Sequence, residues 1–259
     1  MPNITISIPG LTTMLFVFLR VGAVLMGLPI FNSQSVPVLF RLALAFCIAL
    51  ILRPLVPQAH VPVFYGALDF GLAIGRELLI GFALALAVRM VFAGIQLAGQ
   101  MAGYQMGLAL ANVIDPNSSN QVPVLAQFNN LLALLVFLII GAHHWFILEL
   151  VRSFSMIPLG GATMHAPVLK VLVALGGEMF AVAVKVGAPV IISQLVASVI
   201  LGLIARTVPQ MNVFIVAMPL QIGIGLFFMG VAMTQMATYF GSLFQHLAIE
   251  VMNLMRLMA

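Results

Sequence analysis

Apolar residues fill most of this chain in six long runs, which short polar stretches separate. A helix that crosses a membrane needs about 20 mostly apolar residues. The runs that approach or exceed that length are Leu11–Phe31, Leu42–Val56, Ala67–Gly94, Phe128–Leu148, Val171–Ala205 and Val213–Met233. Turn-forming residues between neighbouring runs favour helical hairpins. We therefore predict an all-α membrane protein that forms one unit without a separate soluble domain.

The C-terminal stretch Met236–Met258 has a different pattern. Its large apolar residues lie on one side of a helix, and His246, Glu250 and Asn253 lie on another. Such a helix rests on a membrane surface or docks on a partner. We expect an amphipathic C-terminal helix after the sixth apolar run.

Composition supports the membrane interpretation. Of the 259 residues, 63% are hydrophobic and 6% are charged, whereas soluble domains carry about 25% charged residues. The net charge of +4 suits anionic lipid or protein partners. No basic cluster is present of the kind that nucleic acid requires, and the single cysteine, Cys47, excludes a disulfide within the chain.

Several charges interrupt the apolar runs. A charge at the centre of a bilayer costs roughly 2.5–3.5 kcal/mol, so each must face a partner, water or the protein interior. Ion or proton relay and pairing between helices are both open, and pairing is favoured because the charges are scattered and of both signs. The residues predicted to be buried charges are Arg20, Glu77, Glu178, Lys185 and Arg206.

Signs of enzymatic chemistry are weak. His143 and His144 are adjacent, so on a helix they point about 100° apart and form a poor chelating pair. No third ligand, nucleophile–base set or phosphate-binding loop accompanies them. We expect no metal, no cofactor and no catalytic residue.

Glycines recur every four residues in the segment Met90–Pro123. Gly99, Gly103 and Gly107 would form one helical stripe that another backbone can approach closely. Gly71 and Gly75 form a second pair of this kind.

The glycine-rich helix is expected to end at Asp115-Pro116, before the polar stretch Asn117–Gln121. Two interpretations remain open for the segment. One is a packing face followed by a surface turn, and the other is an element that lines a transport pathway.

Motifs spread along nearly the whole chain together carry a family resemblance. In order they are Arg20, Pro29-Ile30-Phe31, Pro37, Arg41, Glu77, Gly81, Gly99-Gln100, Met106-Gly107, Asp115-Pro116, Gly141-Ala142-His143-His144, Ser153-Phe154, Pro158, Ala188-Pro189, Gly202, Arg206, Pro209-Gln210-Met211-Asn212-Val213-Phe214, Pro219 and Gly225. This ordered set resembles the FliR family of flagellar type III export proteins. The related injectisome family shares the architecture.

The resemblance implies an assembly. FliR-like proteins join FliP-like and FliQ-like subunits in a helical export gate, and an FlhB-like protein joins that complex. Residues 1–158 would be a FliP-like part, and residues 159–259 a FliQ-like part. The gate would belong to the flagellar basal body at the bacterial inner membrane.

The resemblance also implies a channel plug. In the family, the loop after the glycine-rich helix projects into the channel, and Met106–Pro123 matches it here. The positions expected to form the plug are Met106, Gly107, Leu108, Leu110, Val113, Ile114, Asp115 and Pro116. Leu110 and Val113 stand where the family often has bulky aromatic residues.

We therefore expect a non-enzymatic subunit that completes and plugs the channel through which unfolded flagellar substrates pass. Its energy would come from partners and the proton-motive force. One alternative is an ion-coupled secondary transporter that uses Glu77, Glu178 and Lys185, which an inverted repeat with broken helices would favour. The other is the equivalent injectisome subunit.

Overall fold

The computed structural model describes residues 8–29, 31, 36–56, 66–108, 124–161, 166–208 and 213–259. Every regular element within these ranges is a helix, and none of them contains a strand. Among these residues, five helices are long and apolar enough to cross a membrane, and a sixth span results if α5 and α6 are counted as one broken helix. The prediction of an all-α membrane protein is confirmed.

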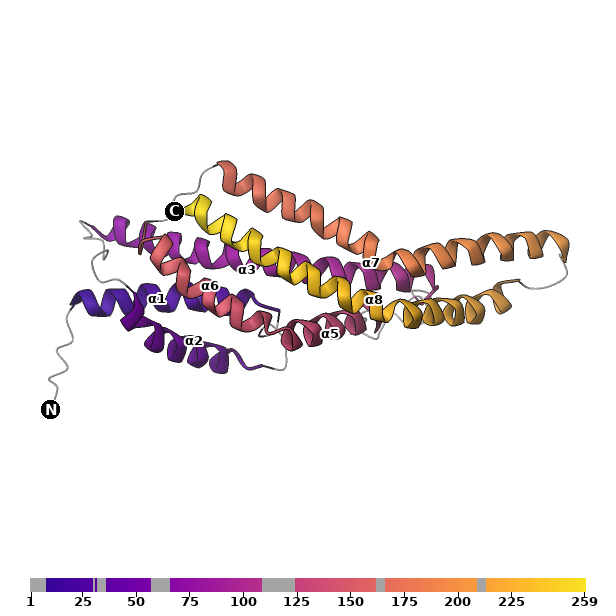
Figure 1. Cartoon of the computed structure of the whole chain (residues 1–259), viewed down its shortest axis with the longest axis horizontal. Coiled ribbons are helices and arrows are strands. Elements are labelled where there is room, and N and C mark those ends of the chain that lie inside the picture. The colour runs from indigo at the N-terminus through magenta and orange to yellow at the C-terminus, as the bar shows by residue number, and fades with distance from the viewer. Residues whose placement is uncertain are drawn as a thin grey trace. The chain divides into compact units, whose positions relative to one another are not determined.

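The helices differ widely in length. They are α1 Ile8–Gly27, α2 Val38–Leu52, the short 3-10 helix η1 Arg53–Leu55, α3 Ala67–Gln105, α5 Val124–Ile139, α6 Ala142–Met156, α7 Ala166–Thr207 and α8 Val213–Met258 (Figure 1). The chain divides into two compact units. Unit 1 contains Met1–Met90, Gly141–Leu175 and Phe244–Ala259, and unit 2 contains Val91–Ile140 and Gly176–Leu243.

The fourth apolar run does not form one helix. It divides into α5 and α6 at Gly141, whose φ of 69° is in the left-handed region. A residue in that conformation cannot continue a right-handed helix, and glycine adopts it without steric cost. The expected single span Phe128–Leu148 is therefore corrected to two helices. The uniformly apolar composition concealed this break.

The C-terminal amphipathic segment is not a separate helix. It is the second half of α8, which runs without interruption for 46 residues from Val213 to Met258. The polar residues Thr234 and Gln235, at the junction expected from the sequence, are compatible with helical backbone. Pro219 in α8 and Pro189 in α7 also lie inside continuous helices, so neither proline ends its helix.

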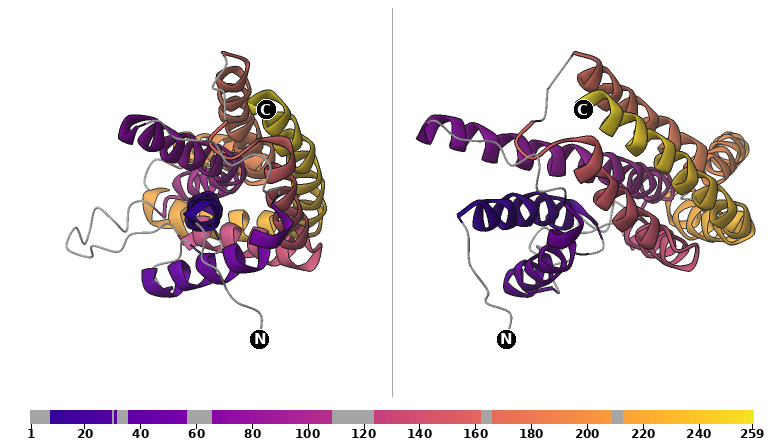
Figure 2. Two further views of the ribbon diagram at one scale, coloured as in Figure 1. Left: turned by 90° about the vertical axis from the view of Figure 1, so that its left-hand side faces the viewer. Right: turned by 60° about the vertical axis from the view of Figure 1, so that its left-hand side comes forward.

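In unit 1, helices approach closely where glycine replaces a side chain. α1 packs beside α2 (Figure 2), and it also meets the first part of α3. A Cβ atom at Gly81 of α3 would lie 2.9 Å from the carbonyl oxygen of Arg20. Gly27 of α1 is similarly close to Ala85 of α3. These contacts set the distance between α1 and α3 at the height of Arg20.

Unit 2 uses the glycine-rich part of α3 in a comparable way. A Cβ at Gly94 would lie 2.6 Å from the Met179 carbonyl oxygen of α7, and one at Gly99 would lie 2.6 Å from the Ala126 Cα of α5. Gly103 is less constrained, since the nearest atom would be a Leu125 methyl carbon at 3.9 Å. The packing stripe expected from the sequence is therefore used mainly at Gly99.

The pair Gly71 and Gly75 differs from the expectation. In unit 1, a Cβ at either position would have no described atom within 4 Å. These glycines form no close helix contact within the described part of this chain. Four-residue spacing identifies a smooth stripe, but it does not identify the surface that covers it.

Candidate functional site

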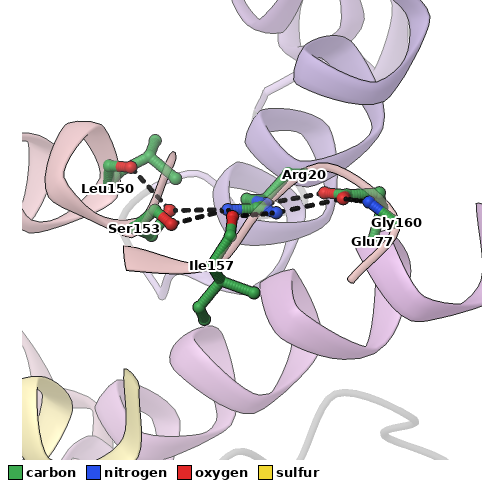
Figure 3. A network of polar contacts seen from close by, with 6 residues as sticks. All are labelled: Arg20, Glu77, Leu150, Ser153, Ile157 and Gly160. Atoms are coloured by element: carbon green, nitrogen blue, oxygen red, sulfur yellow. Dashed lines mark hydrogen bonds and ion pairs between the residues drawn. The ribbon is translucent and has the colours of Figure 1, made fainter. Parts of the chain in front are cut away.

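A fully buried ion pair joins α1 to α3 in unit 1. Arg20 and Glu77 are both 0% exposed. The Arg20 Nε donates to Glu77 Oε2 at 2.6 Å, and Nη2 donates to Oε1 at 3.0 Å (Figure 3). This two-point geometry uses the planar fork of the guanidinium, which lysine could not reproduce.

Arg20 also caps the C-terminal end of α6. Its Nη1 donates to the Ser153 carbonyl at 2.9 Å, and both terminal nitrogens lie 3.3 Å from the Ile157 carbonyl. The guanidinium carbon is 4.5 Å from the centre of the Phe154 ring. Carbonyls at a helix C-terminus carry partial negative charge, so a cation there is favourable.

Glu77 fixes the turn that follows α6. Its Oε1 accepts the Gly160 backbone N–H at 2.7 Å, while the neighbouring Arg76 Nη1 donates to the Gly160 carbonyl at 3.0 Å. Gly160 has a φ of 69°, and the Gly161 N–H bonds to the Pro158 carbonyl at 3.0 Å. Gly160 is the third residue of the four-residue turn 158–161, and a positive φ at that position favours glycine.

The network therefore ties three helices and one turn into a single polar centre. Both carboxylate oxygens of Glu77 accept hydrogen bonds, and the Arg20 side chain donates its hydrogen bonds to oxygen atoms of the protein. A carboxylate with its oxygens occupied in this way is held in one orientation. The geometry supports structural pairing of Arg20 and Glu77 over the relay alternative.

The other predicted buried charges occupy different surroundings. Glu178, Lys185 and Arg206 are all exposed on this chain, and within the described residues none of them forms an ion pair. This chain alone does not bury these three positions, and their expected pairing inside an assembly stays a prediction. An apolar run identifies a helix, but it does not show which of its faces the same chain covers.

The sequence reasoning did not select Glu149 of α6. This residue is 1% exposed, and its Oε1 accepts from Arg152 Nη1 at 2.6 Å. Its Oε2 has no hydrogen-bond partner among the described residues. Glu149 lies just beyond the expected run Phe128–Leu148 and could have been found as a charge in an apolar surrounding.

In unit 2, α3 ends before the residues expected to break it. The last helical residue is Gln105, and Gly107 follows with a φ of 77°. The Leu108 N–H bonds to the Gly103 carbonyl at 3.0 Å, and the Gly107 N–H bonds to the Tyr104 carbonyl at 3.1 Å. These two bonds and the left-handed glycine define a Schellman motif.

This termination changes the interpretation of two sequence features. Gly107 is a helix cap and is not the third member of a packing stripe. The expected helix end at Asp115-Pro116 is corrected to Gln105, because the glycine cap closes α3 one turn beyond Gly103. The signal was present in the sequence, since glycine is strongly enriched just after helix ends.

Met106 anchors the end of α3 in the core of unit 2. It is 0% exposed and belongs to a cluster with Ala102, Leu125, Val190 and Met229, against which Leu108 also packs. This group is called the base cluster below.

Gly225 of α8 makes room for Met106. A Cβ at Gly225 would lie 2.7 Å from Met106 Cγ and 2.8 Å from Gln194 Nε2. The Gln194 Nε2 itself donates to the Gln221 carbonyl at 2.6 Å, which ties α7 to α8 beside the base cluster.

The base cluster holds both ends of the segment expected to form the plug. Met106 and Leu108 precede residues 109–123, and Leu125 follows them, so two positions before this segment and one after it share one cluster. The plug residues outside the described part of the chain are Leu110, Val113, Ile114, Asp115 and Pro116.

The adjacent histidines lie at the start of α6 in unit 1. Their ring centroids are 4.0 Å apart, with 39° between the ring planes. Within the described ranges, no group of three or more potential His, Cys, Asp or Glu ligands comes together. Neither histidine is therefore placed in a set that resembles a metal site.

Known proteins are similar in sequence to this chain over most of its length. The chain matches the model of the family described as bacterial export proteins, family 1, over residues 11–247. Fold and match together define an all-α membrane protein of the bacterial export class. FliR, the flagellar biosynthetic protein of Escherichia coli strain K12, is 35% identical over 237 residues, which cover 92% of this chain and 88% of that protein.

FliR proteins of other bacteria are also similar to this chain. The flagellar biosynthetic protein FliR of Bacillus subtilis strain 168 is 34% identical over 245 residues, covering 92% of each chain. That of Aquifex aeolicus strain VF5 is 31% identical over 218 residues, covering 83% of each chain. The chain belongs to the FliR family and is a component of the flagellar export apparatus at a membrane.

Proposed function

We propose that this chain completes the channel of the flagellar export gate and that Met106–Pro123 plugs the channel at rest. The anchoring of both ends of residues 109–123 on the base cluster is the main support. Because the residues that flank this segment share one cluster, its two ends are held close together, which suits a plug better than a flexible tether. Met106 would then act as the anchor of the plug, since it is fully buried.

The gate would be built with FliP-like and FliQ-like subunits and an FlhB-like protein at the bacterial inner membrane, within the basal body. Residues 1–158 would supply a FliP-like part, and residues 159–259 a FliQ-like part. Large apolar side chains such as Ile192 and Phe227, which are 62% and 66% exposed, support this proposal. Apolar faces of this kind require cover by lipid or other subunits.

The role would be non-enzymatic. Unfolded export substrates would pass through the channel, with energy from other parts of the apparatus. The paired state of Glu77 supports this view over the secondary-transporter alternative, because a carboxylate bonded to Arg20 and Gly160 is not available as an ion-coupling group.

Deletion of residues 109–117 tests the plug proposal. Membranes that carry the assembled gate should show higher ion conductance after the deletion, because a short apolar constriction that excludes water is lost. A second variant that replaces residues 109–117 with an equal number of Gly and Ser residues keeps the length and removes the apolar side chains. It should leak as well. Recovery of intact complex is measured for both variants.

Two outcomes would contradict the proposal. Intact complex with unchanged conductance in both variants would show that these residues do not close the channel. Loss of assembly in both variants would show that they serve packing between subunits.

Co-expression tests the proposed partners separately. The chain produced alone should aggregate, and co-expression with FliP-like and FliQ-like subunits should increase the yield of monodisperse protein. A stable protein purified alone, without any gain on co-expression, would refute the assembly proposal.

A further inference from the structure

Four polar side chains interrupt the apolar hairpin that α7 and α8 form in unit 2. They are Ser193, Gln194 and Ser198 of α7 and Gln221 of α8. No charged residue occurs in the surrounding stretches 186–205 and 213–233. Gln194, Ser198 and Gln221 take part in hydrogen bonds between the two helices. Ser193 instead bonds to a carbonyl of its own helix, that of Val190, at 2.8 Å.

Gln194 is the most deeply buried of the four, with 0% of its surface exposed. Its Nε2 donates to the Gln221 carbonyl oxygen at 2.6 Å. Because that carbonyl can only accept, the amide nitrogen of Gln194 must face it and the amide oxygen must face elsewhere. The Oε1 atom has no hydrogen-bond partner among the described residues. A buried amide with one unpaired group is less favourable than an apolar side chain of the same size, so stability alone does not explain a glutamine here.

The contact between Gln194 and Gln221 fixes the register of α7 against α8. The two helices run antiparallel, since Val190 also shares the base cluster with Met229 (Figure 1). In the same register, the Gln221 Nε2 lies 3.5 Å from the Ser198 Oγ. Apolar side chains of similar volume replace one another at modest cost, so the apolar contacts of the hairpin distinguish one register from another only weakly. A buried polar contact forms in a single register, as a lone asparagine does in a coiled coil.

This register determines whether the end of α3 fits against α8. A Cβ at Gly225 would lie 2.7 Å from Met106 Cγ and 2.8 Å from Gln194 Nε2, so both side chains use the space that this glycine leaves. A shift of α8 by one helical turn would bring Gln221 or Met229 to that place, and both of them carry long side chains. The observed register is therefore the one that leaves room for Met106.

We propose that Gln194 is a positioning residue of the export gate. Its amide holds α7 and α8 in the register at which Gly225 accommodates Met106, and it thereby keeps the anchor of the plug in place. The last step of this inference rests on the proposed plug, whereas the register of the hairpin does not. Gln194 thus favours one arrangement of an apolar hairpin at the expense of some stability.

Disulfide crosslinking in the co-expressed complex measures the register directly. Cys47 is exposed and is first replaced by Cys47→Ser. Ser198→Cys and Gln221→Cys then place two thiols where the native side chains are in contact. Addition of Gln194→Met, which has a similar length but cannot form the hydrogen bond, should lower the disulfide yield several-fold. Ser193→Ala is the matched control and should leave the yield unchanged, because this buried serine bonds within α7.

Ion conductance of the resting gate tests the connection to the plug. Gln194→Met should raise the conductance, and Ser193→Ala should not. The denaturation midpoint of the Gln194→Met complex should equal or exceed that of the wild type, because a buried amide is replaced by an apolar side chain. In the variant that also carries the cysteine pair, oxidation should lower the conductance again and reduction should restore the leak, since the disulfide holds the register without the amide.

Several results would overturn the proposal. Equal disulfide yields with and without Gln194→Met would do so whatever the role of the plug. A leak that oxidation of the cysteine pair does not reverse would show that register is not its cause. A lower denaturation midpoint with loss of assembly would show that Gln194 serves stability.

Deletion of residues 109–117 separates this inference from the plug proposal. If the deletion leaks but Gln194→Met does not, Gln194 does not hold the anchor of the plug and the inference is wrong. If the deletion leaves conductance unchanged while Gln194→Met lowers the disulfide yield, the plug proposal fails and the role of Gln194 in the register of the hairpin stands.

Discussion

Replacing Arg20 with methionine should destabilise the assembled protein strongly. Methionine has a similar length but cannot donate hydrogen bonds, so Glu77 would keep only the Gly160 N–H as a partner. The carbonyls of Ser153 and Ile157 would lose the donor from Arg20. Because Arg20 and Glu77 are 0% exposed, water does not replace the missing contacts in the native packing.

The expected magnitude follows from that burial. Breaking a buried pair by removing one partner costs about 3–5 kcal/mol, which corresponds to a roughly 100- to 4,000-fold change in the folding equilibrium. Glu77→Gln should have a comparable effect, since it leaves the guanidinium as a buried charge. The double variant removes both charges, and its glutamine oxygen can still accept the Gly160 N–H.

A double-mutant cycle measures this coupling. Denaturation midpoints of the purified complex are compared for the wild type, both single variants and the double variant. The double variant should lose at least about 2 kcal/mol less than the sum of the single losses, within the range for contacting residues. Arg89→Met is the control, because Arg89 is exposed and a surface substitution should stay within about 0.5 kcal/mol.

Two results would refute the reasoning. Additive losses in the cycle would show that Arg20 and Glu77 do not depend on each other. A single variant Arg20→Met as stable as Arg89→Met would show that the polar centre of unit 1 does not stabilise the assembled protein.

Two further predictions concern glycines. Gly225→Ala should displace Met106 and make the resting gate conduct ions. Gly230→Ala is the control and should not, because a Cβ there meets no described atom within 4 Å. Equal ion conductance of the two variants would contradict the proposed role of Met106 as the anchor of the plug. Gly99→Ala should cost about 1–3 kcal/mol by overpacking, while Gly103→Ala should be neutral or gain up to about 1 kcal/mol from helix propensity. Thermal denaturation of the complex measures the stability of the Gly99→Ala and Gly103→Ala variants. Equal losses in the two variants would contradict the packing described for α3.

The helices were largely predictable from the sequence, whereas several of their ends were not. Long apolar runs can hardly satisfy their backbone groups except as helices, so the locations of α1, α2, α3 and α7 followed from composition. The break at Gly141 depends on one backbone angle, and α8 is continuous because residues at the expected junction, Thr234 and Gln235, keep helical backbone. Hydropathy averages over about 20 residues, so it is insensitive to one glycine.

The charge network shows a second limit. The sequence indicated that Arg20 and Glu77 need compensation, but the residues are 57 positions apart and nothing in one sequence pairs them. Glu178 and Lys185 have equally apolar neighbours in the chain, yet both are exposed. Arg20 and Glu77 lie on helix faces that other helices of unit 1 cover, whereas Glu178 and Lys185 lie on uncovered faces of unit 2. This difference is a property of packing.

For the candidate plug, the sequence indicated the segment but not the residue that holds it. Its proposed location comes from the family resemblance, but the burial of Met106 in the base cluster could not be predicted, because a methionine in an apolar chain carries no distinguishing signal. Gly225 was part of the resemblance without a stated reason. The close approach of Met106 supplies that reason.

Anchoring both ends of residues 109–123 on one cluster has a consequence for how this region can change over evolution. The entropy of closing a loop grows only slowly with its length, and a doubling costs about 0.6 kcal/mol. Insertions or deletions between Leu108 and Val124 are therefore inexpensive while the base cluster persists. In terms of folding free energy, residues 109–123 can therefore vary in length, whereas the buried residues that hold the two ends, Met106 and Leu125, cannot be changed without cost.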